Sequence, residues 1–387
     1  MMHASEMFPT VMILGSTGSV GEQAIDVAKQ HGIRVTALCA HKNFQRVAEQ
    51  ARELHVTAAA MTDVQAAAAL RLSLADTDIK VYGGEEGLLA MIEEVPAEFA
   101  VNAILGEAGL RPTLSVLSSG KHLALANKES LVVAGELVMA AAKERELRIT
   151  PVDSEHSAIF QALRAGNERE IKRLILTASG GPFFGKKRTE LSDITVDDTL
   201  AHPTWQMGAK ITVDSATLMN KGFEVIEAAH LFGVPADKID VVVHRESIIH
   251  SMVEYIDNSV IAQMSVPDMR LCVQYALTAP HRTEAVIPQL DLLQVGKLTF
   301  ASPDTETFPL LSLAKKAFSL GGGTPAALNA ANEIAVAAFL SRRISFLKLS
   351  DTVLRVTEDM PHAAGAHTLS QILDIDREAR ERALALI

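Results

Sequence analysis

The sequence is poor in the features that mark secreted and membrane-spanning proteins. It has only two cysteines, Cys39 and Cys272, both inside apolar runs, which is too few for a disulfide framework or a zinc site. No uninterrupted apolar stretch is long enough to span a bilayer. Residues 1–10 lack the basic and apolar parts of an export signal. These absences predict a protein of the reducing cytoplasm.

Positive charge is also scarce. The 36 lysines and arginines are outnumbered by 47 aspartates and glutamates, and the net charge is −11. This balance argues against non-specific binding to nucleic acid, although local groups in an acidic protein can still bind one phosphate. With 48% hydrophobic and 21% charged residues, the 387-residue chain is expected to fold into about two or three globular domains.

A glycine-rich turn stands between an apolar run and a helical stretch near the start. Residues 10–14 are typical of a buried parallel strand, and 22–30 have helical character. Between them lies Gly15-Ser16-Thr17-Gly18-Ser19-Val20-Gly21. Strand, glycine turn and helix predict a dinucleotide loop, with the pyrophosphate on the helix N-terminus. The spacing is a variant of the usual fingerprint, and a turn chosen only for packing is the alternative.

The second expected strand, 34–40, ends in His41-Lys42-Asn43. An acidic residue there would bind the ribose of NAD, whereas a basic group accommodates the 2′-phosphate of NADP. The sequence therefore favours NADPH, mainly through Lys42, with His41 and Arg46 nearby. The alternative for Lys42 is an exposed loop residue without this function.

Tyrosine is rare, and this excludes one class of NADPH enzyme. Short-chain dehydrogenases need a tyrosine followed four residues later by a lysine. The three tyrosines, Tyr82, Tyr255 and Tyr275, are followed at that distance by Glu86, Ser259 and Ala279.

Further strands are expected at 58–61, 79–82, 99–105 and 121–126, separated by helical stretches. This alternation predicts a doubly wound parallel sheet, whose ligands lie beyond the carboxyl ends of the strands. Asn127, Lys128 and Glu129 follow the last of these strands and are site candidates. A solvated helix-start residue is the alternative reading of Lys128.

Two carboxylates, Asp153 and Glu155, follow a short expected strand at 147–150. In an extended segment residues i and i+2 point to the same side, so both side chains would converge on one point. Converging carboxylates suit a hard divalent cation such as Mg²⁺ or Mn²⁺. Because this spacing is common, a solvated strand end is the alternative.

Polar loops follow the next expected strand, 171–178. Ser179-Gly180-Gly181 combines a hydroxyl with two glycines, which is typical of a phosphate-binding turn. The polar segment 186–208 indicates a lid or binding loop, with His202 and the single tryptophan, Trp205, near its end.

A second polar cluster lies shortly after this loop. Ser215, Asn220 and Lys221 offer hydroxyl, amide and ammonium groups that could hold a phosphate. Glu224, on an expected helix at 222–231, could complete a metal site begun by the earlier carboxylates.

The remaining pattern changes from strands to helices. Strands expected at 240–244 and 259–266 belong to an open, partly antiparallel sheet, and the chain is helical from Pro309 onward. Thr324 is the expected N-cap before Pro325, and another helix is expected to begin at Ser350. Asn329, Asn332 and Glu333 could face an active site, but helix packing is the alternative.

These patterns give an α/β fold class: an N-terminal Rossmann-type parallel sheet, a central α/β catalytic domain with an open, partly antiparallel sheet, and a C-terminal helical bundle. The expected domains are a cofactor domain at 1–150, a catalytic domain at 151–281 with a mobile loop at about 180–209, a linker at 282–304 and a helical domain at 305–387.

Several motifs in this order resemble those of the 1-deoxy-D-xylulose 5-phosphate reductoisomerase family over nearly the whole chain. They are Gly15-Ser16-Thr17-Gly18-Ser19-Val20-Gly21, Ala126-Asn127-Lys128-Glu129-Ser130, Pro151-Val152-Asp153-Ser154-Glu155-His156, Thr177-Ala178-Ser179-Gly180-Gly181-Pro182-Phe183, His202-Pro203-Thr204-Trp205-Gln206-Met207-Gly208 with Asn220-Lys221-Gly222-Phe223-Glu224, and Leu328-Asn329-Ala330-Ala331-Asn332-Glu333.

The resemblance implies a role for each matching residue. The metal ligands are Asp153, Glu155 and Glu224. The substrate-binding residues are Ser154, Glu155, Ser179, His202, Trp205, Ser215, Asn220, Lys221 and Glu224. The cofactor positions are Gly15, Ser16, Thr17, Gly18, Ser19, Val20, His41, Lys42, Asn43, Asn127, Lys128, Glu129 and Gly208. The catalytic residues are Lys128, Asp153, Glu155, His202 and Glu224. One departure is His41, where members often have glycine or another small residue.

The implied activity is the NADPH-dependent rearrangement and reduction of 1-deoxy-D-xylulose 5-phosphate to 2-C-methyl-D-erythritol 4-phosphate in non-mevalonate isoprenoid synthesis. The implied cofactors are NADPH and Mg²⁺ or Mn²⁺, with Co²⁺ as a further candidate. The implied partners are a small phosphorylated sugar and a second copy of the chain, without nucleic acid or membrane. Lys128, Glu155 and bound water all stay open as the general base. The alternatives are an NADPH-dependent oxidoreductase for another phosphorylated sugar and a non-catalytic NADP sensor.

Overall fold

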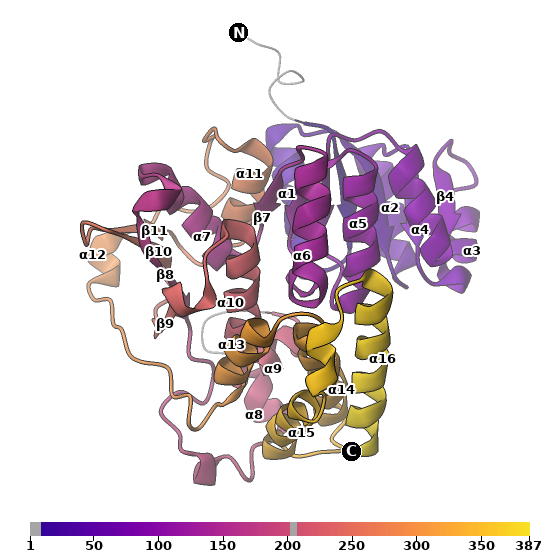
Figure 1. Ribbon diagram of the computed structural model, residues 1–387. Coiled ribbons are helices and arrows are strands. Elements are labelled where there is room, and N and C mark those ends of the chain that lie inside the picture. Colours follow the sequence, from indigo (N-terminus) through magenta and orange to yellow (C-terminus); the bar gives the residue numbers. More distant parts are fainter. Residues whose placement is uncertain (1–8, 202–206) are drawn as a thin grey trace. The chain divides into compact units, whose positions relative to one another are not determined.

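Seven parallel strands form one sheet in the computed structural model, which describes residues 9–201 and 207–387 (Figure 1). Their order is β4-β3-β2-β1-β5-β6-β7, so the strand order reverses at β1 and β5. The predicted doubly wound sheet is therefore confirmed. The strands are β1 (Val11–Leu14), β2 (Val35–Ala40), β3 (Ala58–Met61), β4 (Lys80–Gly83), β5 (Phe99–Asn102), β6 (His122–Leu125) and β7 (Ile149–Pro151).

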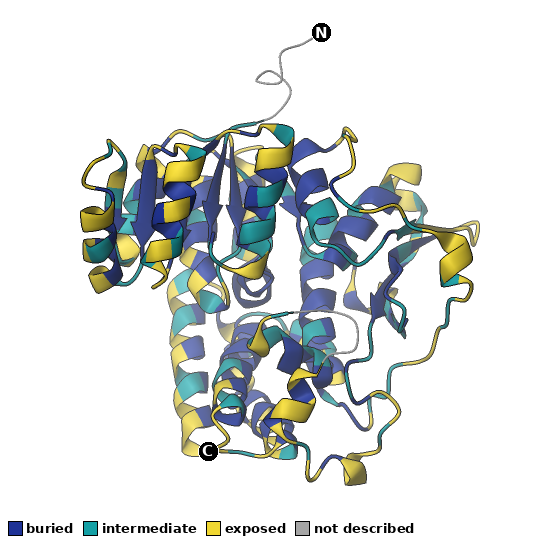
Figure 2. Ribbon diagram, turned by 180° about the vertical axis from the view of Figure 1, so that it is seen from behind, coloured by how far each residue is buried: buried dark blue, intermediate teal, exposed yellow. Residues whose placement is uncertain are grey.

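The central strands of this sheet are covered on both faces. Every residue of β1, β2, β3 and β5 is buried, as expected for apolar parallel strands between layers of helices. Figure 2 shows these strands in dark blue and the outer sides of the neighbouring helices in yellow. The helices of the unit that contains this sheet are α1 (Ser19–His31), α2 (Phe44–Leu54), α3 (Val64–Ser73), α4 (Gly84–Glu94), α5 (Leu110–Ser118) and α11 (Arg270–Thr278). Helices α6 (Glu129–Glu144) and α7 (Ser154–Ala162) each have residues in both units of the chain.

The chain divides into two compact units. The first comprises the residues through Ser130, Val138–Ser157 and Asp268–Pro288, and the second comprises the rest. The segment that contains α11 belongs to the first unit, where Thr150 Oγ1 donates to Ala276 O at 3.0 Å. The division of the chain into functional domains stays a prediction.

The second unit contains a four-stranded sheet of order β11-β10-β8-β9. β8 and β9 are parallel, and β10 is antiparallel to both β8 and β11, so the predicted mixed sheet is confirmed. Sequence patterns did not predict β10, because His250, Ser251 and Glu254 interrupt its apolar residues although all three are buried. The strands are β8 (Ile171–Ala178), β9 (Ile239–Val243), β10 (Ile249–Tyr255) and β11 (Val260–Met264).

The helical part of the second unit is organised around α14. This helix has many alanines, and Ala326, Ala327, Ala330 and Ala331 have no exposed surface, which lets neighbouring helices approach it closely. The predicted helical bundle is confirmed. The helices of this unit are α8 (Val196–Leu200), α9 (Ala209–Ala216), α10 (Met219–Phe232), α12 (Leu292–Val295), α13 (Leu310–Leu320), α14 (Thr324–Leu340), α15 (Phe346–Glu358) and α16 (Leu369–Ala385).

Three local predictions were wrong. Asp153 and Glu155 do not lie in an extended segment, because the strand ends at Pro151 and α7 begins at Ser154. Serine, aspartate and glutamate all favour a helix start, and Ser157 N donates to Asp153 O at 2.8 Å to close the first turn.

The other two errors concern helix starts. The N-cap of α14 is Gly323, one residue before Thr324. Helix α15 begins at Phe346, not near Ser350, because Ser345 caps it by accepting a hydrogen bond from Lys348 N at 3.2 Å.

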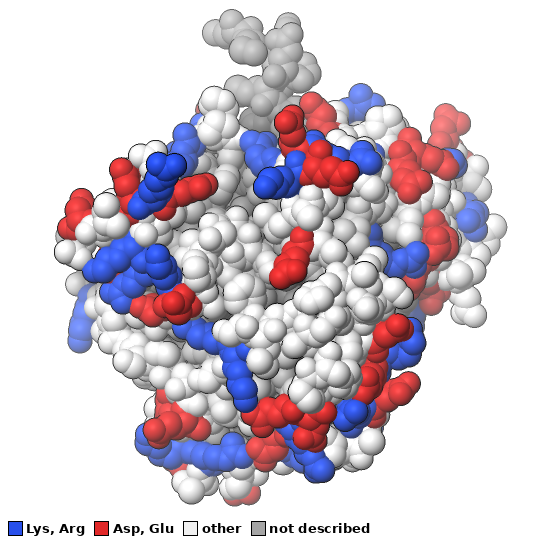
Figure 3. All heavy atoms as spheres, viewed as in Figure 1, with Lys and Arg blue, Asp and Glu red and all other residues white. Residues whose placement is uncertain are grey.

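Charged side chains of both signs are mixed on the surface. On the face drawn in Figure 3, lysines and arginines lie beside aspartates and glutamates. Exposed ion pairs of the described residues include Arg52–Asp76 and Arg111–Glu86. None of the helices among the described residues is both long enough and apolar enough to cross a membrane.

Candidate functional site

The turn between β1 and α1 is closely packed in the first unit. The N–H groups of Gly15 and Ser16 both donate to Cys39 O at 2.8 Å. A Cβ at Gly15, whose φ is +89°, would lie 2.6 Å from Ala103 O, and one at Gly21 would lie 2.2 Å from Gly15 O. A Cβ at Gly18 would meet only Gly15 O, at 3.4 Å. Gly15 and Gly21 are therefore required for packing, whereas Gly18 is next to open space.

That open space is at the N-terminus of α1. Gly18 is the N-cap and provides no side-chain cap, so the first N–H groups of the helix are available to a ligand. Gln50, fully buried on α2, supports the turn from behind by donating to Ser16 O at 3.1 Å. The predicted residues Thr17, Ser19 and Val20 complete this turn. The arrangement can bind a pyrophosphate through backbone N–H groups.

The polar residues after β2 have different surroundings. Asn43 caps α2 by accepting from Arg46 N at 3.2 Å, and His41 Nδ1 lies 2.8 Å from Thr62 Oγ1. Lys42 is exposed. Arg46 is held by the carboxylates of Glu22 and Glu49. Lys42 is thus the better placed of the two cations to meet a ligand phosphate.

Asn127 connects the loops that follow β5 and β6. It is buried, and its Nδ2 donates to Ile104 O at 2.6 Å and to Gly106 O at 2.8 Å, while its Oδ1 accepts from Ser130 N at 2.9 Å. A Cβ at Gly109 would clash with this amide. The structure therefore gives Asn127 a loop-organising role, and its contact with the cofactor stays a prediction.

Lys128 and Asp153 form an ion pair in the first unit. Both side chains are nearly buried, at 7% and 11% exposure, and His156 Nδ1 lies 3.7 Å from the same carboxylate. Burial raises the pKa of Asp153, but the charges of Lys128 and His156 outweigh it and hold the pKa well below its usual range. Asp153 is therefore an anion across the physiological pH range.

Glu155 is the neighbouring acid, in the first turn of α7. Ser154 Oγ donates to its Oε2 at 2.5 Å. Asp153 directly precedes α7 and Glu155 lies in its first turn, so both acids are at a helix start of the first unit and not on an extended strand. Two carboxylates in this segment supply the hard oxygen donors that Mg²⁺ and Mn²⁺ prefer.

The predicted phosphate residues of the second unit lie on two connected segments. Ser179 follows β8, and Gly180 and Gly181 have φ values of +78° and +65°. A Cβ at Gly181 would lie 2.9 Å from the carbonyl oxygen of Ser215. The turn that carries Ser179 therefore packs directly on the end of α9 that carries Ser215.

The other members of this set are on α10, which begins one residue after Leu218 in the left-handed conformation. Asn220 Nδ2 donates to Glu224 Oε1 at 2.5 Å, and Lys221 forms an ion pair with the same carboxylate. Lys221 and Glu224 are 4% and 1% exposed. Two of the predicted phosphate residues, Asn220 and Lys221, and the third predicted metal ligand, Glu224, are therefore neighbours within one helix.

Of the three predicted residues of the binding loop, the structure describes Gly208. His202 and Trp205 lie outside the described residues. Gly208 is the N-cap of α9, and no atom of the described residues lies within 4 Å of a Cβ built at this position.

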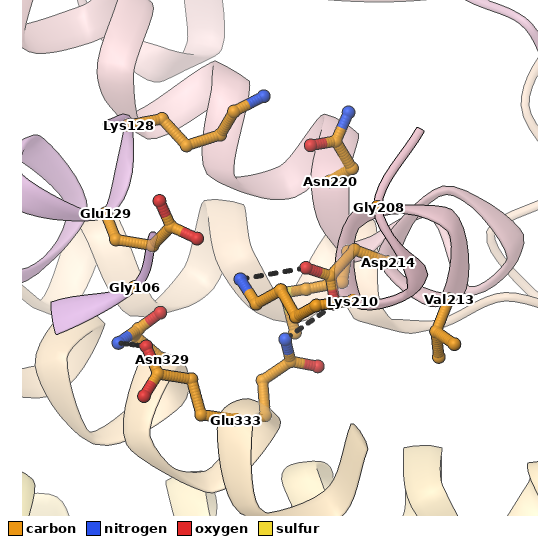
Figure 4. Close-up of polar contacts among 12 residues, drawn as sticks. Gly106, Lys128, Glu129, Gly208, Lys210, Val213, Asp214, Asn220, Asn329 and Glu333 are labelled. Atoms are coloured by element: carbon orange, nitrogen blue, oxygen red, sulfur yellow. Dashed lines mark hydrogen bonds and ion pairs between the residues drawn. The ribbon is translucent and has the colours of Figure 1, made fainter. Parts of the chain in front are cut away.

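Sequence reasoning missed two interactions of the second unit. Arg245 Nη1 donates to Gly181 O at 2.8 Å and to Ser179 O at 3.3 Å, so it braces the serine turn. Asp214 accepts from Asn332 Nδ2 at 2.7 Å, a contact drawn in Figure 4. The 118-residue separation of this pair leaves no local sequence pattern, although the polar residues on an apolar helix were a hint.

Profiles of one protein family match three successive parts of the chain. Family profiles match residues 11–135, described as 1-deoxy-D-xylulose 5-phosphate reductoisomerase, residues 149–232, described as the C-terminal domain of that enzyme, and residues 264–382, described as the DXP reductoisomerase C-terminal domain. The reductoisomerase of Caldanaerobacter subterraneus is 49% identical over 375 residues, which are 96% of this chain and 97% of the relative. The chain belongs to the 1-deoxy-D-xylulose 5-phosphate reductoisomerase family.

Other members of the family agree. The reductoisomerase of Chlorobium chlorochromatii is 50% identical over 96% of this chain and 97% of its own length. The Zymomonas mobilis reductoisomerase, solved with NADPH, has a TM-score of 0.90 and 41% identity over 97% of this chain and 98% of that one. A reductoisomerase solved with NADPH, fosmidomycin and magnesium has a TM-score of 0.90 and 38% identity over 97% of this chain and 98% of that one. The family inferred from the order of the motifs is confirmed, while the individual residue roles stay predictions.

Proposed function

We propose that this protein converts 1-deoxy-D-xylulose 5-phosphate to 2-C-methyl-D-erythritol 4-phosphate, with NADPH as the reductant, in non-mevalonate isoprenoid precursor synthesis. The observation that carries the proposal is membership of the reductoisomerase family over 96% of the chain, with every implied site residue present. The reaction cleaves and re-forms a carbon–carbon bond, and the resulting aldehyde is then reduced. NADPH supplies the hydride, and a divalent metal supplies Lewis acidity toward the substrate oxygens.

The residues of the first unit fit NADPH. The turn at Gly18 leaves space beside the N-terminus of α1, whose N–H groups suit a pyrophosphate. Lys42 and Asn43 follow β2 at the position where a 2′-phosphate is bound in this type of fold. We assign to Lys42 the ionic contact with the 2′-phosphate, and we place His41 next to it in the same cofactor-binding segment.

The acidic residues fit a hard divalent cation. Asp153 is held ionised by Lys128, and Glu155 follows it in the first turn of α7. Glu224, the third proposed ligand, belongs to the second unit and is almost fully buried. The donors are carboxylate oxygens, the set that Mg²⁺ and Mn²⁺ prefer and that Zn²⁺ rarely uses alone.

The polar residues of the second unit fit the substrate phosphate. Ser179, Ser215, Asn220 and Lys221 bring hydroxyl, amide and ammonium donors to the ends of β8, α9 and the first turn of α10. The phosphate is remote from the reacting carbons, so its binding energy can orient the substrate and exclude water.

Lys128 is the proposed catalytic cation of the first unit. It is 5% exposed and paired with Asp153, so its ammonium group is fixed in position and can hold a substrate oxygen. Removal of the lysine would leave Asp153 as a buried carboxylate without this partner, which costs several kcal/mol in typical proteins, about 3–5.

The test is NADPH oxidation by the purified protein with 1-deoxy-D-xylulose 5-phosphate. We expect turnover with Mg²⁺ or Mn²⁺, none after treatment with excess chelator, and recovery when metal is restored. The product is to be identified as the branched polyol phosphate by mass spectrometry and NMR. Metal-independent turnover would refute the proposed metal site, and NADPH binding without turnover would refute the proposed substrate.

Glu224→Gln separates an enzyme from an NADP sensor. A sensor has no use for the carboxylate, so its NADPH binding and any residual activity would be unchanged. An enzyme of the proposed kind loses turnover and keeps NADPH binding, because Glu224 belongs to the other unit from the glycine turn.

We also propose a homodimer in the cytoplasm. Two free, buried cysteines suit a reducing compartment. Strand β11 is at the edge of the second sheet, where Val260 and Ile261 are 47% and 37% exposed, and such an edge favours pairing with a second copy. Light scattering of Ile261→Lys is the test: a smaller oligomer supports this interface, and an unchanged mass contradicts it.

A further inference from the structure

Asp214 is a carboxylate buried inside the second unit. It is on α9, is 1% exposed, and accepts a hydrogen bond from Asn332 Nδ2 of α14 at 2.7 Å (Figure 4). Asn332 has no exposed surface. Because an ionised carboxylate can only accept hydrogen bonds, the amide must turn its nitrogen toward Asp214. The contact is therefore directional and ties α9 to α14.

Lys210, in the first turn of α9, also contacts Asp214. Its Nζ lies 3.0 Å from Asp214 Oδ2 and 5.2 Å from the centre of the Phe223 ring on α10. Figure 4 shows the lysine pointing toward the aspartate. Lys210 thus contacts a carboxylate of its own helix and an aromatic ring of the next one.

Helix α9 carries Ser215 and lies in the chain between the other two segments with proposed phosphate residues, the Ser179 turn and α10. Its last turn contacts the Ser179 turn so closely that Gly181 has no room for a Cβ, which would lie 2.9 Å from Ser215 O and 3.1 Å from Ala216 Cα. After α9, the single left-handed residue Leu218 sets the direction of α10. A displacement of α9 would therefore move Ser215 against Ser179 on one side and against Asn220 and Lys221 on the other.

We infer that Asn332, acting through Asp214, is a positioning residue for the phosphate end of the substrate. The inference rests on the proposed function for the identity of the substrate. Asp214 immediately precedes Ser215, and it would lose the buried amide donor of Asn332 if α9 moved away from α14. The C-terminal helical region therefore fixes the geometry of a binding site whose proposed ligands all come from earlier in the chain.

Two variants change the Asp214–Asn332 pair, and a third changes Asn329, another buried asparagine of α14. Asn332→Asp places two buried carboxylates against each other and should push α9 away. The double variant Asp214→Asn/Asn332→Asp restores one donor and one acceptor with the roles exchanged. Asn329→Ala is the matched control, because Asn329 is equally buried on α14 but donates within its own helix, to Glu333 Oε1 at 3.1 Å.

Two measurements are to be made on the full-length protein. The first is steady-state kinetics with 1-deoxy-D-xylulose 5-phosphate. The second, which needs no activity, is the rise in melting temperature caused by inorganic phosphate, since a ligand of the folded state stabilises it. We expect Asn332→Asp to raise KM about tenfold with kcat within about threefold, and to remove most of the phosphate-induced rise. The double variant should recover most of both, and NADPH affinity should stay unchanged throughout.

Each outcome decides the inference. An unchanged KM and phosphate response in Asn332→Asp would overturn it. So would equal effects in Asn329→Ala, or a double variant no better than the single one, because these would mean general destabilisation of α14. A wild-type protein without turnover would refute the proposed function instead, and the phosphate response would then decide the inference alone.

Discussion

Arg46 binds the carboxylate of Glu22 through two parallel hydrogen bonds, from Nε at 2.7 Å and from Nη2 at 2.8 Å. Its remaining nitrogen, Nη1, donates to Glu49 at 2.9 Å. These hydrogen bonds lower the pKa of Glu22 and join α1 to α2 beside the glycine turn. A bidentate pair of this kind fixes the guanidinium in place. Arg46 therefore holds α1 and α2 together, and its guanidinium is paired with two carboxylates.

Lys42 and Arg46 can be separated by cofactor choice. Lys42→Ala should weaken NADPH binding about tenfold and leave NADH binding within about twofold, because only NADPH carries the 2′-phosphate. Arg46→Ala is the comparison and should weaken both cofactors by the same small factor while lowering the free energy of unfolding by about 1 kcal/mol. Fluorescence titrations with both cofactors test this. A larger loss of NADPH preference in Arg46→Ala would assign the phosphate contact to Arg46.

Two glycines of the same turn should respond oppositely to a methyl group. In Gly21→Ala the new Cβ would meet backbone at 2.2 Å, which cannot yield, so we expect a loss of about 1–3 kcal/mol in the free energy of unfolding. In Gly18→Ala the fold should be retained, because the nearest atom is 3.4 Å away, but the methyl occupies the space proposed for the pyrophosphate. Thermal melts and NADPH titrations measure both effects. Full NADPH affinity in Gly18→Ala would place the pyrophosphate elsewhere.

Both thiols should be unreactive in the folded protein. Burial raises the pKa of Cys39 and of Cys272 from 9.0 to about 12. Since thiolates are the reactive form, we expect no modification by a disulfide reagent at pH 8 and reaction of both cysteines in denaturant. Because the pKa of each thiol is higher in the folded than in the unfolded state, the neutral thiols favour the folded state. Their contribution to the free energy of unfolding is complete below pH 9 and is lost as the pH rises toward 12. Modification of one thiol in the native state would show that its site opens.

The sequence alone predicts those structural elements that depend mainly on residues close together in the chain. Residues 58–61 and 171–178 were predicted with the bounds that the structure has, because each is a short, mainly apolar segment that ends at polar residues. The glycine turn was predictable for the same reason, since its chemistry lies within seven consecutive residues.

Other features depend on residues far apart in the sequence. The pairing of Asp214 with Asn332 and the bracing of Ser179 by Arg245 leave no periodic pattern. The segment at Asp153 was misread because a strand and a helix start compete there, and the capping preference of the residues after Pro151 decided the outcome. The site residues named from motif order stay predictions, whereas the local conformation expected for Asp153 and Glu155 was wrong, because the helix start there decides their geometry.

Asp153→Asn should separate catalysis from cofactor binding. The substitution keeps the size of the side chain but removes the charge that pairs with Lys128 and that would bind the metal. We expect turnover to fall at least about 1,000-fold, because the metal contributes several kcal/mol of transition-state stabilisation, while the Kd for NADPH changes less than about threefold. Asp76→Asn is the control, since it also removes a carboxylate paired with a cation, Arg52, but on the exposed surface. Loss of NADPH binding in Asp153→Asn would mean that this carboxylate supports the cofactor site, and retained turnover would remove it from the metal ligands.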